Sequence, residues 1–102
     1  MILPEHLHTK NQKIIDRYGT DLQIRQLMEE CAEVIQKANK YLRAKEEHGK
    51  AEIHRAEADL KTEMADVTVL FDQIMPRIGM TDEELYQIAD YKIDRQLGRM
   101  KG

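Results

Sequence analysis

Glycines stand at the positions where helices would stop, and this feature constrains the fold of the chain most. They are Gly19, Gly49, Gly79 and Gly98. The intervening segments are rich in Ala, Leu, Glu, Lys, Gln and Arg, which all favour helix. No alternating run of β-branched residues is long enough for a strand. The sequence therefore predicts an all-α protein.

Apolar residues recur at helical spacing in four segments. The segments are about Glu5 to Tyr18, Leu22 to His48, Ile53 to Met75 and Thr81 to Met100. Pro76 is expected to end or kink the third helix, because proline lacks the amide donor and clashes with the preceding turn. Thr81 begins the sequence TDEE, a capping box for the fourth helix. Short connections predict a four- to five-helix, bundle-like architecture, with residues 1–102 as one domain.

The second and third helices each carry an apolar stripe that predicts the core. The stripe residues are Ile24, Leu27, Met28, Cys31, Ile35, Ala38 and Leu42 in the second helix, and Leu60, Met64, Val67, Leu70, Phe71, Ile74 and Ile78 in the third. The lone Cys31 is expected to be a small buried hydrophobe. A chain of 102 residues buries a limited share of its surface, so dimerisation is expected to aid its stability.

Composition excludes several classes of protein. Basic and acidic residues number 16 and 19 and are interspersed, so nothing resembles the basic stripe of a nucleic-acid binder. No window approaches the roughly 18 apolar residues of a membrane span. The N-terminal residues lack the apolar region of a signal peptide. We therefore expect a cytoplasmic protein without nucleic-acid or membrane partners. The histidines, at positions 6, 8, 48 and 54, are expected on the surface.

Four carboxylates gather beside the predicted core. In the second helix, Glu30 and Glu33 lie three residues apart on one flank of the apolar stripe, so they can converge on a common point. In the third helix, Glu63 falls within the stripe and Asp66 lies at its edge. A buried carboxylate without a partner is costly, and like charges add repulsion. These four groups must therefore be paired with cations or bind a metal.

Carboxylate oxygens suit hard divalent ions, and magnesium is normally held by carboxylates together with substrate phosphates. No histidine stands at the spacing that di-iron carboxylate bundles use. Magnesium, with manganese as a substitute, is therefore the predicted metal. The alternative is that these glutamates form an ordinary solvated helix face, which is the usual role of a single ExxE pair.

One face of the fourth helix becomes basic towards its C-terminal end, where Lys92 and Arg95 are followed by Arg99. Such a face could meet phosphates that carboxylates would repel. Alternatively, these cations form salt bridges or extend to solvent at a helix end, where positive charge is favoured.

The acidic motifs resemble those of a known family. EECAE at 29–33, followed by EMAD at 63–66, resembles the EExxE and ExxD motifs of the MazG-like all-α nucleoside triphosphate pyrophosphohydrolases. YKIDR at 91–95 is similar to the lysine-x-x-arginine segment of many members. The resemblance spans about Gln23 to Arg99. Two departures are a somewhat long interval between the acidic motifs and Pro76 in the tail of the third helix.

The resemblance implies that the four carboxylates, Glu30, Glu33, Glu63 and Asp66, bind magnesium. It also implies that Lys92 and Arg95 contact the triphosphate, and that Glu30 or Glu33 is the catalytic base. The implied reaction splits an NTP or dNTP into the monophosphate and pyrophosphate, in a homodimer or homotetramer whose core is completed by oligomerisation. Two alternatives remain open, a non-catalytic helical interaction module and a nucleotide-binding regulator. Gln23 and Tyr91 are candidates for reading the base.

Overall fold

The structure is a computed structural model that describes residues 2–47 and 49–101. These residues form α1 (Glu5–Tyr18), α2 (Thr20–Glu47), α3 (Lys50–Arg77) and α4 (Asp82–Met100), and no strand. The predicted all-α class and four helices are confirmed. The predicted end of the second helix, His48, lies outside the described residues. Within the described part of the chain, no helix combines the length and apolarity that a membrane span requires.

Two of the four glycines connect helices through a left-handed backbone conformation. Gly19 has φ 89° between α1 and α2, and Gly79 has φ 77° after α3. Other residues adopt such angles only at an energetic cost. The expectation of a stop at Gly98 was wrong, because this glycine lies inside α4. A single glycine near a helix end lowers helix stability by only about 1 kcal/mol, so the helix continues through it.

Pro76 lies inside the last turn of α3, which ends one residue later at Arg77. A proline cannot donate to the carbonyl four residues earlier, here that of Asp72. The side chain of Gln12 in α1 donates to this carbonyl instead, at 3.1 Å. The chain then leaves the helix in a Schellman turn, with Met80 N donating to Met75 O at 2.9 Å and Gly79 N to Pro76 O at 3.2 Å.

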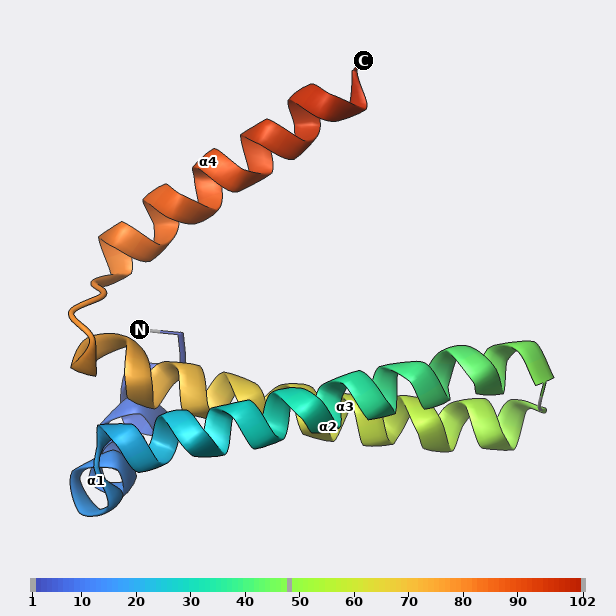
Figure 1. Ribbon diagram of the computed structural model, residues 1–102, viewed down its shortest axis with the longest axis horizontal. Coiled ribbons are helices and arrows are strands. Elements are labelled where there is room, and N and C mark those ends of the chain that lie inside the picture. Colours follow the sequence, from blue (N-terminus) through green and yellow to red (C-terminus); the bar gives the residue numbers. More distant parts are fainter. Residues whose placement is uncertain (1, 48, 102) are drawn as a thin grey trace.

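The helix α4 starts directly after this turn. Thr81 is its N-cap and accepts a hydrogen bond from Glu84 N at 3.1 Å, as the capping box predicted. Figure 1 shows α2 and α3 as a long antiparallel hairpin, α1 across one end of it, and α4 projecting away. Among the described residues, the first turn of α4 lines a cavity with residues of α1 and α3, and the rest of α4 does not pack along the other three helices. One chain alone therefore does not form a closed four-helix bundle.

The core lies where α1 meets the hairpin. It consists of Ile15 in α1 and of Leu70 and Ile74 in α3, with Ile24 and Leu27 of α2 packed against them. The remaining length of the hairpin extends beyond this core (Figure 1).

A buried carboxylate joins α1 to α3 beside this core. The side chain of Asp72 is fully buried. It accepts hydrogen bonds from His8 Nδ1 at 2.9 Å, from Asn11 Nδ2 at 3.0 Å and from Leu3 N at 3.2 Å. The expectation that His8 is a surface residue was wrong, because its ring is largely buried against this carboxylate.

The polar network continues into α2. Gln73 donates from Nε2 to Asn11 Oδ1 at 2.8 Å, and Gln23 donates from Nε2 to Gln73 Oε1 at 2.8 Å. Asn11, Gln23 and Gln73 are all buried. The network therefore links α1, α2 and α3 through side chains whose hydrogen bonds are directional, which favours a single arrangement of these helices.

Much of the predicted core is exposed in one chain. On each of α2, α3 and α4, three of the exposed apolar residues are spaced seven apart, and we call these sets the exposed stripes. They are Met28, Ile35 and Leu42 on α2, Met64 and Phe71 on α3 with Ile78 directly after its end, and Tyr86, Ile93 and Met100 on α4. The sequence predicts a core position for the first six of these residues, and in one chain they are exposed because α4 does not cover them.

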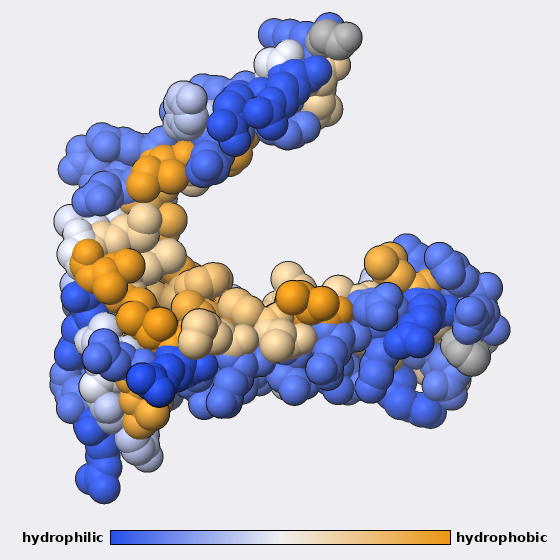
Figure 2. Space-filling model, in the orientation of Figure 1, coloured by the Kyte–Doolittle hydropathy of each residue, from blue (hydrophilic) through white to orange (hydrophobic). Residues whose placement is uncertain are grey.

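Apolar side chains line the hollow between α4 and the hairpin (Figure 2). The chain exposes 7733 Å² in total. A compact monomer of this mass, 12.0 kDa, exposes about 6,000 Å². The radius of gyration is 16.7 Å, whereas a compact domain of this length has about 13 Å. One chain therefore exposes roughly 1,700 Å² more surface than its mass requires.

Replacing Asp72 tests the buried network. Asp72→Ala leaves the donors of His8, Asn11 and Leu3 without their acceptor. We expect it to lower the free energy of unfolding by about 3–5 kcal/mol. Asp59→Ala, at an exposed position of α3, is the control and is expected to change it by less than about 0.5 kcal/mol. Urea unfolding followed by circular dichroism, at one protein concentration, measures both; equal effects would contradict the role of Asp72.

The same residue predicts a dependence of stability on pH. Burial by itself would raise the pKa of Asp72, but the hydrogen bonds from Asn11, His8 and Leu3 N and the positive charge of His8 outweigh it, so the pKa lies below the usual 3.8. A lowered pKa stabilises the fold above pH 3.8, and this stabilisation is lost as the pH falls through the folded-state value. We expect unfolding curves at pH 7 and pH 3 to differ more for the wild type than for Asp72→Asn. An equal difference between pH 7 and pH 3 in the two proteins would contradict the lowered pKa of Asp72.

Candidate metal centre

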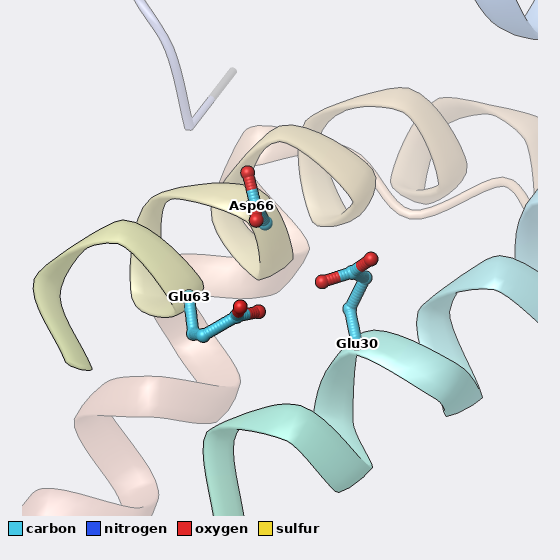
Figure 3. A group of neighbouring side chains, drawn as sticks. All are labelled: Glu30, Glu63 and Asp66. Atoms are coloured by element: carbon cyan, nitrogen blue, oxygen red, sulfur yellow. The ribbon is translucent and has the colours of Figure 1, made fainter. Parts of the chain in front are cut away.

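Three of the predicted carboxylates meet between α2 and α3. Glu30 of α2 and Glu63 and Asp66 of α3 each place a carboxylate oxygen within 4.8 Å of the others, and we call them the acidic cluster. Figure 3 shows the Glu30 and Glu63 side chains directed toward each other across the space between the two helices, with Asp66 beside them on α3. The structure thus brings together three of the four carboxylates that the sequence singled out, and their role as metal ligands stays a prediction.

The helical period explains this convergence. Glu63 and Asp66 are three residues apart and project from neighbouring positions on α3. Because α2 runs antiparallel to α3, Glu30 lies opposite them on the same side of the hairpin (Figure 3). Glu30 and Glu63 are half-buried and Asp66 is exposed. The cluster therefore has a protected inner part and an open outer edge.

The fourth predicted ligand, Glu33, is half-buried on α2 and does not belong to the acidic cluster. Its negative charge still acts on Glu63. Glu29 is exposed on α2. The second helix therefore provides one carboxylate to the cluster itself and a second one beside it.

The pKa of Glu63 is raised above its usual value of 4.5. The largest cause is the hydrogen bond with the carboxyl group of Glu30, which requires a proton on one of the two groups. Burial is the next cause, followed by the negative charges of Glu30, Asp66 and Glu33. The carboxylates therefore repel one another when nothing positive lies between them.

No cation within the described part of the chain forms an ion pair with these carboxylates. Among residues 2–47 and 49–101, no salt bridge reaches Glu30, Glu33, Glu63 or Asp66. Apart from the carboxyl group of Glu63, the side-chain partner of Glu30 among the described residues is Gln26, four residues earlier in α2, whose Nε2 donates to Glu30 Oε1 at 3.0 Å. Pairing of these carboxylates with Lys or Arg within one chain is therefore excluded for the described residues.

The inner part of the cluster also contains an unsatisfied atom. Glu63 Oε2 is buried and has no hydrogen-bond partner. A buried acceptor without a donor is unfavourable, and such groups in folded proteins normally have a protein, water or ion partner. A hard divalent cation prefers a set of carboxylate oxygens. The geometry and chemistry of Glu30, Glu63 and Asp66 therefore fit a metal ion such as Mg²⁺ or Mn²⁺.

The predicted phosphate contacts lie elsewhere. Lys92 and Arg95 are exposed on α4, in a part of the helix that does not pack on either helix of the acidic cluster. The guanidinium of Arg95 lies 5.9 Å from the centre of the Tyr91 ring on the same helix. One chain therefore does not bring these cations to the carboxylates.

Two other expectations are resolved by the fold. Gln23 is buried and donates to Gln73, so its amide is used inside the protein. Tyr91 is exposed on α4, away from the acidic cluster. The Asp72 network was missed at the level of sequence. Its one signal was the pair Asp72–Gln73 between apolar Phe71 and Ile74, where a helix face would otherwise be apolar.

A scan against protein-family models and searches of the curated proteins and of the solved structures find no match to this chain.

Removing one charge from the cluster should stabilise the metal-free protein. In Glu63→Gln, an amide can donate to Glu30 without adding negative charge. We expect a rise in Tm on the order of a few degrees in the presence of chelator. Glu29→Gln, which removes the same charge at an exposed position, is the control. Thermal unfolding followed by circular dichroism measures both, and a Tm that falls in Glu63→Gln would contradict the repulsion.

Proposed function

We propose that this protein is a magnesium-dependent nucleoside triphosphate pyrophosphohydrolase, which releases pyrophosphate and the nucleoside monophosphate. The single observation that supports this proposal best is the acidic cluster, which contains the buried unsatisfied oxygen of Glu63 and has no ion pair with a cation among the residues that the structure describes. The resemblance of its two acidic motifs to those of MazG-like enzymes gives the reaction class.

Glu30, Glu63 and Asp66 would hold the divalent ion. When bound, such an ion neutralises phosphate charge and makes a water molecule more acidic. The open side at Asp66 gives a triphosphate access from solvent, while the half-buried Glu30 and Glu63 hold the inner side.

Glu33 is the better of the two candidate bases, because it lies beside the cluster rather than within it. In the proposed reaction a water oxygen attacks the α-phosphorus and Glu33 accepts the water proton. The bond from the α-phosphorus to the bridging oxygen breaks, and pyrophosphate leaves with the bonding electron pair. Glu30 remains a metal ligand in this assignment.

The activity is tested by pyrophosphate release from a panel of ordinary and modified NTPs and dNTPs, with magnesium or with chelator. We expect magnesium-dependent release, and a loss of about 100-fold or more in Glu63→Gln. Asp59→Asn, which removes a charge at an exposed position of α3 outside the acidic motifs, is the control and should retain activity. Product analysis must show monophosphate and pyrophosphate; diphosphate and phosphate, or no product, would contradict the proposal.

The two roles on α2 are separated by a binding measurement. Mn²⁺ binding, followed by electron paramagnetic resonance, is expected to weaken at least about 10-fold in Glu30→Gln. In Glu33→Gln we expect near-normal Mn²⁺ binding with a large loss of kcat, because this change removes the proton acceptor. Loss of Mn²⁺ binding in both variants would instead make Glu33 a ligand.

We also propose that the enzyme is a homodimer or homotetramer. One chain exposes roughly 1,700 Å² more surface than a compact monomer of its mass, and a specific interface buries about 800 Å² on each partner. The extra exposed surface is therefore sufficient for such an interface. The exposed stripes supply apolar residues for it. Sedimentation equilibrium should give a mass that is a multiple of 12.0 kDa. Ile35→Glu is expected to lower this mass, and a wild type that stays monomeric at micromolar concentration would exclude the proposal.

A further inference from the structure

A cavity of about 370 Å³ lies where the N-terminal segment, α1, the end of α3 and the first turn of α4 meet. Figure 1 shows the N-terminal segment and the turn after α3 at the same end of the molecule. The apolar part of the cavity wall consists of Ile2, Met75, Pro76, Met80 and Leu85. Cavities of roughly 300–1,000 Å³ are typical of small-molecule sites in proteins, so this one is large enough for a ligand.

The turn after α3 keeps this cavity open. Gly79 has φ 77°, and the turn that it forms directs α4 away from α3. Leu85 in the first turn of α4 therefore lines the cavity together with Met75 and Pro76 instead of closing it. Methionine side chains are flexible and adapt to groups of different shape. The apolar wall can therefore adjust to a ligand.

The polar side of the cavity contains a histidine that Asp72 holds in place. Nδ1 of His8 lies 2.9 Å from both Oδ1 and Oδ2 of Asp72. Oδ1 also accepts a hydrogen bond from Leu3 N, and Oδ2 accepts one from Asn11 Nδ2. Because both oxygens of the carboxylate act as acceptors, Nδ1 of His8 is the donor. The hydrogen on this nitrogen is therefore fixed, and so is the orientation of the ring.

The second ring nitrogen of His8, Nε2, is left for a ligand. Within the described residues it makes no hydrogen bond, and it is not a buried atom. The side chain is 19% exposed and lines the cavity. With Nδ1 protonated, Nε2 accepts a hydrogen bond when the ring is neutral and donates one when the ring is charged. A hydroxyl group suits both states, because it is donor and acceptor at once.

The remaining polar residues of the wall indicate an uncharged ligand. Thr81 Oγ1 accepts the cap hydrogen bond from Glu84 N, and Asp82 is exposed at the start of α4. Among the described residues, no lysine or arginine lines the cavity. An anion would meet the carboxylates of Asp72 and Asp82 without such a cation to offset their charge. Asp72 already accepts hydrogen bonds from three groups of the chain, so it does not require a cationic ligand either.

We propose that this cavity binds a small neutral molecule that has an apolar body and a hydroxyl group, such as a phenol, with the hydroxyl bonded to His8 Nε2. The apolar body would lie against Met75, Pro76 and Leu85. The site is separate from the acidic cluster. Asp72 follows Asp66 by six residues, which places it about 9 Å further along α3 and about 120° away around the helix.

Phenol and toluene test the role of the hydroxyl, because the two molecules have nearly the same shape. Titration is followed by NMR of the methyl groups of Ile2, Met75, Met80 and Leu85. We expect phenol to shift these signals with a Kd on the order of 1 mM. Toluene should bind at least about 3-fold more weakly, because it cannot form the hydrogen bond. Equal affinities would overturn the hydroxyl requirement, and the absence of saturable shifts would overturn the site.

The nitrogen of His8 is tested directly by ¹⁵N NMR of the ring in the wild-type protein. Phenol should shift the Nε2 signal, and toluene should leave it almost unchanged. In His8→Phe, which keeps a ring of similar size, we expect toluene binding to remain and the preference for phenol to disappear. An Nε2 signal that does not respond to phenol would overturn the proposed contact, whether or not His8→Phe folds.

A larger side chain in the cavity tests the location of the site. Leu85→Trp is expected to block the cavity and to weaken phenol binding at least about 10-fold, without removing a hydrogen bond of Asp72. Leu97→Trp, at a half-exposed position of the same helix, is the control and should bind phenol as the wild type does. Binding that survives Leu85→Trp unchanged would overturn the location.

The acidic cluster provides the last comparison. Glu63→Gln, which is expected to abolish pyrophosphate release, should bind phenol with the Kd of the wild type. Loss of phenol binding in this variant would overturn the separation of the two sites. Phenol binding at the cavity in a protein that releases pyrophosphate from no nucleotide would support this site and reject only the proposed reaction.

Discussion

The packing of α1, α2 and α3 depends on the buried carboxylate of Asp72. It holds the N-terminal segment through Leu3, and α1 through His8 and Asn11. The adjacent Gln73 extends the contact to α2 through Gln23. Since the apolar core is small, these directional bonds determine how the helices are oriented. They also place the Gln12 side chain where it donates to the carbonyl of Asp72, to which Pro76 cannot donate. This carbonyl in the last turns of α3 therefore keeps a hydrogen-bond donor.

The acidic cluster lies on the hairpin beyond this polar network. The core of Ile15, Leu70 and Ile74 holds one end of α3, while Glu63 and Asp66 lie further towards the N-terminus of the same helix. The rigid helix therefore carries the carboxylates at a set distance from a well-packed end. Their mutual repulsion is tolerated because the packing that holds them is made elsewhere, which is a common division between stability and function.

Periodicity predicted the helices, the Thr81 cap and the meeting of Glu30, Glu63 and Asp66, because each depends on spacing within a helix or between two neighbouring helices. It did not predict the Asp72 network, since a charged residue on an apolar face gives no sign of the partner that will satisfy it. Nor did it predict that α4 leaves the hairpin. That direction is determined by a few backbone hydrogen bonds around Gly79, and the same amphipathic pattern suits a helix packed on its own chain or on another.

The fixed Schellman turn between α3 and α4 determines where the chain can tolerate insertions. An inserted residue within α3 between Asp66 and Ile78 would move the carboxylates by about 1.5 Å and rotate them by more than a quarter of a turn relative to the start of α4. At the other end of the hairpin, where α2 gives way to α3 near Gly49, added residues lengthen a connection remote from this turn, and loop closure depends only weakly on length. Natural variation in length is therefore expected to accumulate at the hairpin tip, while the segment from the acidic cluster to Thr81 keeps a constant number of residues.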